Sequence, residues 1–260
     1  MRRIDRDKLP SLVDLPVAAR ISAPQNIGRG YCSYERYEIS LPGSSAASEI
    51  ERDVLRSGQV VGILPIDIQR DEVVLIRQFR LASHIALGKG AMIEIPAGRA
   101  GPRESTEQAA FRECYEETGA YPLRLIPLFS VMPAPALSDE CMMLYAASVE
   151  AAQVKARTGC ADEQEDIEPI TASIDAAVGT LRLGGLHNSV AIIALQWLAL
   201  NREILPAIFA SAETLAGSPD VKRVQALSPL AAGYCSRQDA AADNDPKSPQ
   251  VWSASPNRGS

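Results

Sequence analysis

The 260-residue chain is short of several residue types that mark particular classes of protein. It has only two histidines and five cysteines, with no CxxC pair, which argues against a zinc site or a disulfide framework. A protein that binds the nucleic-acid backbone needs a basic face, whereas acidic residues here outnumber basic ones by 32 to 26. We therefore expect an acidic protein of the reducing cytoplasm with no nucleic-acid partner.

Long apolar runs are also missing. The longest, Val190 to Leu200, is interrupted by Gln196 and is shorter than the ~20 residues that cross a bilayer. The N-terminal MRRIDRDKLP has no apolar core of the kind a secretion signal needs. We expect no membrane partner and no secretion. With 46% hydrophobic residues, the chain can nevertheless bury a sizeable core.

Short apolar runs bounded by turn residues predict strands, and longer periodic segments predict helices. We expect strands at residues 29–39, 51–56, 60–66, 73–80, 92–98, 121–130 and 141–147, with a short one around Ile170. Helices are expected over 173–183 and from Asn188 or Ser189 to about Arg202. The two histidines, His84 and His187, fall in stretches that resemble loops.

The chain is expected to divide into three parts. Residues 1–56 are expected to form an N-terminal segment with a β arm, and residues 57–205 the main domain. Residues 206–260 are rich in Ala, Ser, Asp and Pro, and their end has almost no apolar side chains to bury. This predicts a largely disordered tail, with a modest helix near 207–215.

One helix is predicted inside the stretch that runs from Gly98 to Ala120. Ser105 and Gln108 have the spacing of a capping box at its start, and Gly119 is a natural stop at its end. A helix in this position gives the main domain a rigid element directly after a strand.

Three carboxylates share one face of this helix, because Glu113, Glu116 and Glu117 fall within about 100° of one another on the helical wheel. Like charges this close repel, and a divalent cation removes the repulsion. Oxygen ligands on a rigid helix suit Mg²⁺, with Mn²⁺ as a possible substitute. The alternative is a plain solvated acidic face.

The spacing of the whole stretch argues against that alternative. Gly98 is followed after five residues by Glu104, and after seven more by Arg112-Glu-Cys-Tyr-Glu-Glu-Thr-Gly-Ala120. This pattern resembles the Nudix box of the Nudix hydrolase superfamily, with Cys114 and Ala120 standing where larger aliphatics are commoner. The resemblance implies an α/β fold, the Nudix α/β/α sandwich with a mixed sheet, to which the N-terminal β arm is added.

A wider resemblance, over roughly 29–201, is to the ADP-ribose pyrophosphatase branch of that superfamily. It is carried by Pro135, fifteen residues past the box, and by the acidic stretch 161–167. The resemblance implies Mg²⁺-dependent hydrolysis of ADP-ribose to AMP and ribose 5-phosphate by a homodimer. There are two alternatives: the substrate is another nucleoside-diphosphate sugar such as GDP-mannose, or the protein is a non-catalytic Nudix ligand sensor.

The resemblance also implies roles for individual residues. The metal ligands would be Glu113, Glu117, Glu165 and the backbone carbonyl of Ala97. The catalytic residues would be Glu163 as general base, with Arg112 and Glu116 beside the ligands. Substrate would be bound by Arg52, Arg80, Glu140 and Tyr31, since the arginine fork fits phosphate and Tyr31 could stack on adenine. The alternatives are a solvated acidic loop around Glu163, an ordinary strand aromatic at Tyr31, and an Arg112 that only orients carboxylates.

Overall fold

The computed structural model describes residues 13–42, 50–159 and 165–210. The chain separates into two units between Arg56 and Ser57, and each is described by itself. Glu163 and the part of the expected tail from residue 211 onward lie outside the described residues.

The first unit is an antiparallel sheet built on β3 (Ser33–Ser40). One edge of β3 pairs with β1 (Arg20–Ile21) and β2 (Gln25–Arg29), and the other pairs with β4 (Ile50–Arg56). The single strand expected over 29–39 is therefore a hairpin, because the chain turns at residues 30–32. No described residue of this unit is buried, so the sheet has no core of its own.

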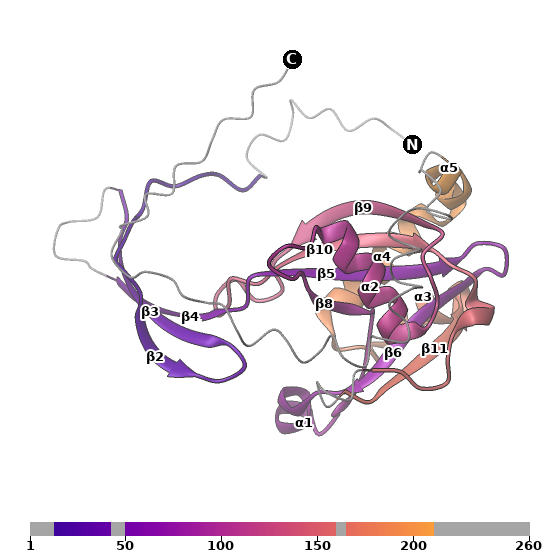
Figure 1. The fold of residues 1–260 in the computed structure, drawn as a ribbon, viewed down its shortest axis with the longest axis horizontal. Helices are drawn as coiled ribbons and strands as arrows, with labels where there is room; N and C mark the ends of the chain where they lie inside the picture. The colour runs from indigo at the N-terminus through magenta and orange to yellow at the C-terminus, as the bar shows by residue number, and fades with distance from the viewer. Residues whose placement is uncertain (1–12, 43–49, 160–164, 211–260) are drawn as a thin grey trace, which may run out of the picture. The chain divides into compact units, whose positions relative to one another are not determined.

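The second unit holds a mixed sheet in the order β11-β6-β5-β10-β9 (Figure 1). Strand β10 runs parallel to β5, and the other neighbours on this path pair antiparallel. The bounds are β5 (Gln59–Asp67), β6 (Glu72–Phe79), β9 (Arg124–Val131), β10 (Cys141–Ser148) and β11 (Ile167–Ser173). Strand β11 is longer than the short segment expected around Ile170.

Helices cover both faces of this sheet, which confirms the predicted α/β/α sandwich. Helix α2 (Thr106–Thr118) packs on one face, where its apolar residues meet inward-facing residues of β5 and β10. On the other face lie α3 (Ile174–Leu183), α4 (Ser189–Asn201) and α5 (Leu205–Ala210). The two cores follow from strand alternation: Val61 and Ile63 face α2, whereas Leu64 and Ile66 face α3 to α5.

Two expectations for this unit need correction. The single strand expected over 92–98 is two short strands, β7 (Ala91–Glu94) and β8 (Ala97–Arg99). His84 lies in a short helix, α1 (Leu81–Leu87), not in a loop. Sequence periodicity missed α1 because it has only seven residues, and most of its side chains are exposed.

Strands β5 and β6 pair with each other at only two positions, Ile66 with Val73 and Asp67 with Glu72. Beyond these, β6 pairs with β7 and β5 pairs with β8. The sheet is therefore split at this end, and the segment between β7 and β8 crosses from one strand to the other. The N–H of Ile63 donates to the carbonyl of Pro96 at 2.8 Å, which ties this crossing to β5.

The consecutive helical segments α4, η4 (Arg202–Ile204) and α5 form one apolar stretch, Ser189–Ala210, of 22 residues. By length and composition alone it could cross a membrane. Core helices pass the same test, and this stretch contributes buried side chains such as Leu195, Leu198 and Phe209 to the core. The expected tail boundary at residue 206 falls inside α5.

Candidate active site

Helix α2 begins and ends as its sequence predicts. The N–H of Gln108 donates to Ser105 Oγ at 3.2 Å, and the N–H of Ser105 donates to Gln108 Oε1 at 3.1 Å, so the capping box is formed. At the other end Gly119 adopts the left-handed conformation, with φ of 81°. The caps fix where each carboxylate of the helix points.

Two of the three helix carboxylates turn inward. Glu113 and Glu117 are 9% and 3% exposed, whereas Glu116 is exposed. The N–H of Ala97 donates to Glu117 Oε2 at 2.7 Å, which ties the helix to β8. A Cβ atom at Gly98 would lie only 1.9 Å from Glu113 Oε1, so β8 and the carboxylate approach closely because Gly98 has no side chain.

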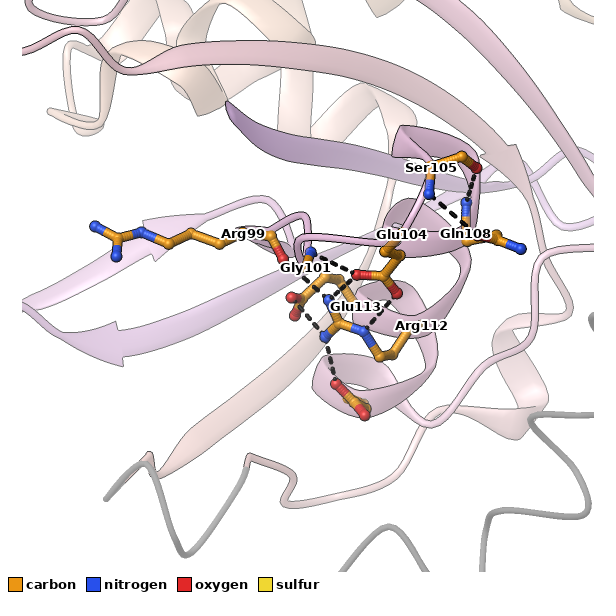
Figure 2. Close-up of polar contacts among 8 residues, drawn as sticks. Arg99, Gly101, Glu104, Ser105, Gln108, Arg112 and Glu113 are labelled. Atoms are coloured by element: carbon orange, nitrogen blue, oxygen red, sulfur yellow. Dashed lines mark hydrogen bonds and ion pairs between the residues drawn. The ribbon is translucent and has the colours of Figure 1, made fainter. Parts of the chain in front are cut away.

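Arg112 joins the loop before the helix to its carboxylates (Figure 2). Its Nε and Nη2 atoms each donate to Glu104 at 2.9 Å, and Nη2 also donates to the carbonyl of Arg99 at 3.0 Å. Its Nη1 donates to Glu113 at 2.7 Å and to Glu116 at 2.9 Å. The guanidinium is thus fully engaged within the protein, and this geometry agrees with a role in orienting carboxylates.

The charges at this site depend strongly on burial. The pKa of Glu113 is raised to about 7, chiefly by burial and also by the charges of Glu116 and Glu165, against the lowering effect of Arg112. The pKa of Glu117 lies well above its usual value because the side chain is buried beside Glu113, although the Ala97 N–H opposes the shift. Burial alone would raise the pKa of Glu104, but its bonds with Arg112 and the Gly101 N–H hold it below the usual range. The protein therefore supplies too little positive charge to keep the buried carboxyl groups of Glu113 and Glu117 ionised at their ordinary pKa.

Arg80 lies where β6 ends and is held by Glu94 of β7. Its Nε donates to Glu94 Oε1 at 3.0 Å and its Nη2 donates to Oε2 at 2.8 Å, a bidentate pair on a buried carboxylate. The pKa of Arg80 is raised: burial works against the charge, but Glu94, Glu117 and Glu165 outweigh it. Arg80 was among the expected substrate-binding residues. Its partner Glu94 was not, although a Glu among the apolar residues of 92–98 was a visible signal.

The segment before β11 brings a further carboxylate to the site. The carbonyl of Glu117 accepts a hydrogen bond from Thr158 Oγ1 at 2.6 Å, and Thr158 forms a β-bridge with Ile167. Glu165, two residues before that bridge partner, raises the pKa of both Glu113 and Glu117. The expected ligand Glu165 is therefore electrostatically linked to the helix carboxylates.

The loop between β9 and β10 places Glu140 against the first residues of the unit. Glu140 Oε2 accepts a hydrogen bond from Ser57 Oγ at 3.2 Å. The neighbouring Asp139 accepts from the N–H groups of Ser57 at 2.6 Å and Gly58 at 3.2 Å. Asp139 was missed by sequence reasoning, because only the fold brings it to residues about 80 positions away.

Comparison with known proteins identifies the family. A model described as the NUDIX domain matches residues 56–184. The ADP-ribose pyrophosphatase of Escherichia coli strain K12 is 33% identical over 187 residues, which cover 71% of this chain and 90% of that protein. The chain is a Nudix hydrolase.

Two further relatives are named for two different substrates. The ADP-ribose pyrophosphatase of Haemophilus influenzae is 30% identical over 186 residues, 70% of this chain and 86% of that protein. The GDP-mannose pyrophosphatase of Enterobacter sp. strain 638 is also 30% identical, over 152 residues, 58% of this chain and 78% of that protein. The family match therefore supports a pyrophosphohydrolase.

The remaining expected site residues of this Nudix hydrolase, Arg52 and Tyr31, belong to the first unit. Arg52 lies on β4 opposite Tyr37, and its Nη1 donates to the carbonyl of Glu51 at 2.8 Å. Tyr31, in the turn between β2 and β3, is 87% exposed. Both are described only within that unit.

The side chains of helix α2 include oxygen donors of the kind that bind a divalent cation. The described residues contain no group of three or more Asp, Glu, His or Cys side chains already arranged as a metal site. Glu113 and Glu117 are buried oxygen donors that raise each other's energy when ionised. Glu116 is occupied by Arg112. The donors present suit a hard, oxygen-preferring cation and leave room in its coordination for water or substrate oxygens.

Proposed function

We propose that this Nudix hydrolase cleaves the pyrophosphate bond of ADP-ribose, giving AMP and ribose 5-phosphate, with Mg²⁺ as its cation. The observation that carries the chemistry is the buried carboxylate pair Glu113 and Glu117, held between Arg112 and β8. The likeness to proteins named ADP-ribose pyrophosphatase extends over 70% or more of the chain and supports the choice of substrate.

The cation itself would be held by Glu113, Glu117, Glu165 and the carbonyl of Ala97. When bound, it supplies positive charge that offsets the phosphate oxygens and acidifies a water molecule. The protein contributes orientation. Arg112 fixes Glu113, and the Ala97 N–H fixes Glu117, so the carboxylates are placed before substrate arrives.

Side chains around the pair would perform the rest of the reaction. Arg80 keeps a charged guanidinium beside the site while Glu94 holds its Nε and Nη2 atoms, and its outer edge would contact a phosphate oxygen. Glu163 would take the proton from the attacking water, a step that needs a carboxylate within hydrogen-bond reach of it. Arg52, Tyr31 and Glu140 would bind the nucleoside and sugar.

The second candidate substrate is GDP-mannose, favoured by the likeness to the Enterobacter protein of that name. A panel of nucleoside-diphosphate sugars with Mg²⁺, in which both products are identified, separates the two. We expect the highest kcat/KM for ADP-ribose, with AMP and ribose 5-phosphate released together. A tenfold preference for GDP-mannose would assign the enzyme to the other substrate.

We also propose that the enzyme is a homodimer whose N-terminal sheet serves the partner's site. The support is the absence of a buried residue among the described residues of the first unit, because a small sheet with no apolar core needs another surface for stability. Light scattering at micromolar concentration should give twice the chain mass. An active monomer under the same conditions would contradict this proposal.

A further inference from the structure

Gln78, near the end of β6, is a buried polar residue that the proposed reaction does not yet use. Its side chain is 7% exposed, and its Nε2 atom donates to Glu165 Oε1 at 3.4 Å. Its Oε1 atom is buried and accepts no hydrogen bond from any described residue. A buried carbonyl oxygen without a donor is destabilising, so it calls for a partner.

The side chain of Gln78 lies on the helix α2 side of the sheet. Residues two apart on a strand point to the same face, and Val74 packs in the core cluster that contains α2. Gln78 has the same parity as Val74. Its register partner Ile167 is bridged to Thr158, and Thr158 Oγ1 donates to the carbonyl of Glu117 at 2.6 Å. This end of β6 therefore lies close to the last turn of the helix that carries the carboxylate pair.

The orientation of the amide follows from its neighbours. If the amide were rotated by 180°, Oε1 would face the carboxylate of Glu165 and the two oxygens would repel. The nitrogen therefore faces Glu165, and the oxygen is left for another group. An amide oxygen beside several carboxylates is a suitable acceptor or ligand for a hydrated hard cation and a poor place for an anion.

We propose that Gln78 is a positioning residue of the cation site, whose Nε2 orients Glu165 while its Oε1 faces the hydrated cation. This inference rests on the proposed function, since it concerns the same cation. It assigns a use to a buried polar atom that the sheet itself leaves unsatisfied. Residues that support metal ligands in this way typically contribute about 10- to 100-fold to metal affinity.

The test is a titration of the metal-free full chain with Mn²⁺ alone, in which the free ion is followed by electron paramagnetic resonance. Gln78→Leu removes both the donor and the oxygen, whereas Gln78→Glu keeps an oxygen and removes the donor. Gln153→Leu is the matched control, because Gln153 Nε2 likewise donates to a glutamate, Glu150, at 2.9 Å on the surface. The Tm of each metal-free variant is measured in parallel.

We expect Gln78→Leu to raise the Mn²⁺ Kd at least tenfold, with a metal-free Tm within about 3 °C of wild type or above it, because an unsatisfied oxygen is removed. Gln78→Glu keeps an oxygen toward the cation but loses the donor to Glu165, so it should bind more weakly than wild type and more tightly than Gln78→Leu. Gln153→Leu should match wild type. Wild-type Mn²⁺ affinity in Gln78→Leu would overturn the inference. Equal weakening in Gln78→Glu, or a metal-free Tm lowered by many degrees in Gln78→Leu, would overturn it as well.

Failure of this inference and failure of the proposed function give different results. Hydrolysis of ADP-ribose by wild type, together with unchanged Mn²⁺ binding in Gln78→Leu, rejects the role of Gln78 alone. Mn²⁺ binding that depends on Gln78 in a protein that does not hydrolyse ADP-ribose rejects the proposed substrate alone.

Discussion

Gly98→Ala should separate the carboxylate site from the fold. The backbone permits alanine, because Gly98 is not among the glycines with positive φ. The added Cβ would lie 1.9 Å from Oε1, 2.1 Å from Cδ and 2.5 Å from Oε2 of Glu113. Ordinary contact needs about 3.5 Å, so the carboxylate must move by more than ~1 Å.

The group that yields is the far end of a flexible side chain, so the sheet and helix can stay in place. Glu113 would then lose its 2.7 Å bond from Arg112 and its position beside Glu117. A misplacement of about 1 Å at a reacting centre can lower the rate about 10²-fold, which corresponds to ~2.7 kcal/mol of transition-state stabilisation. We expect this loss in kcat/KM, a weaker Mn²⁺ affinity, and a Tm within a few degrees of wild type.

The assay is steady-state hydrolysis of ADP-ribose with Mg²⁺, accompanied by thermal unfolding in chelator. Gly101→Ala, in the loop that follows β8, is the matched control, since its Cβ would meet Glu104 at an ordinary 3.5 Å. It should keep nearly wild-type activity. If Gly98→Ala were as active as Gly101→Ala, the argument that Gly98 makes room for a working Glu113 would be wrong.

Three further predictions concern the same site. The folded-state pKa of Glu113 is raised from 4.5 to about 7, so the metal-free protein should lose up to about 3 kcal/mol of unfolding free energy as pH rises from about 4.5 to 7. Denaturant titrations in chelator that show no such fall would contradict this. Glu163→Gln should lower kcat about 10²- to 10⁴-fold without rescue by excess Mg²⁺, whereas Glu117→Gln should recover partly at high Mg²⁺. A wild-type kcat in Glu163→Gln would show that Glu163 is not the general base. Arg112→Lys should lower both kcat and Tm, because one ammonium group cannot replace contacts to Glu104, Glu113 and Glu116, and a fully active, equally stable variant would argue against this positioning.

The parts of the site that depend on local spacing could be predicted from the sequence. The capping box and the glycine stop are set by neighbours within one helix, and the structure shows both of them. The burial of Glu113 and Glu117 was not predicted. The α/β/α sandwich followed from the resemblance and is confirmed. Periodicity placed the three carboxylates on one face but did not separate the exposed Glu116 from the buried Glu113 and Glu117, because the three directions fall within about 100° on the wheel.

Contacts between distant segments could not be predicted in the same way. Gln78 meets Glu165 across 87 positions, and Asp139 meets Ser57 across 82. No local pattern encodes such pairs, since they depend on strand order and register. The break between β7 and β8 has the same origin: the apolar run over 92–98 looks continuous, but its two halves pair with different strands.

The split between β5 and β6 has a consequence for how this enzyme can change. A continuous ladder between these strands would satisfy more backbone groups and make a more regular sheet. It would also displace β8, whose Ala97 N–H holds Glu117 and whose Gly98 admits Glu113. Substitutions selected only for heat resistance would therefore tend to close the split and lose hydrolysis, so selection for stability and selection for activity should oppose each other most strongly at residues 95–98.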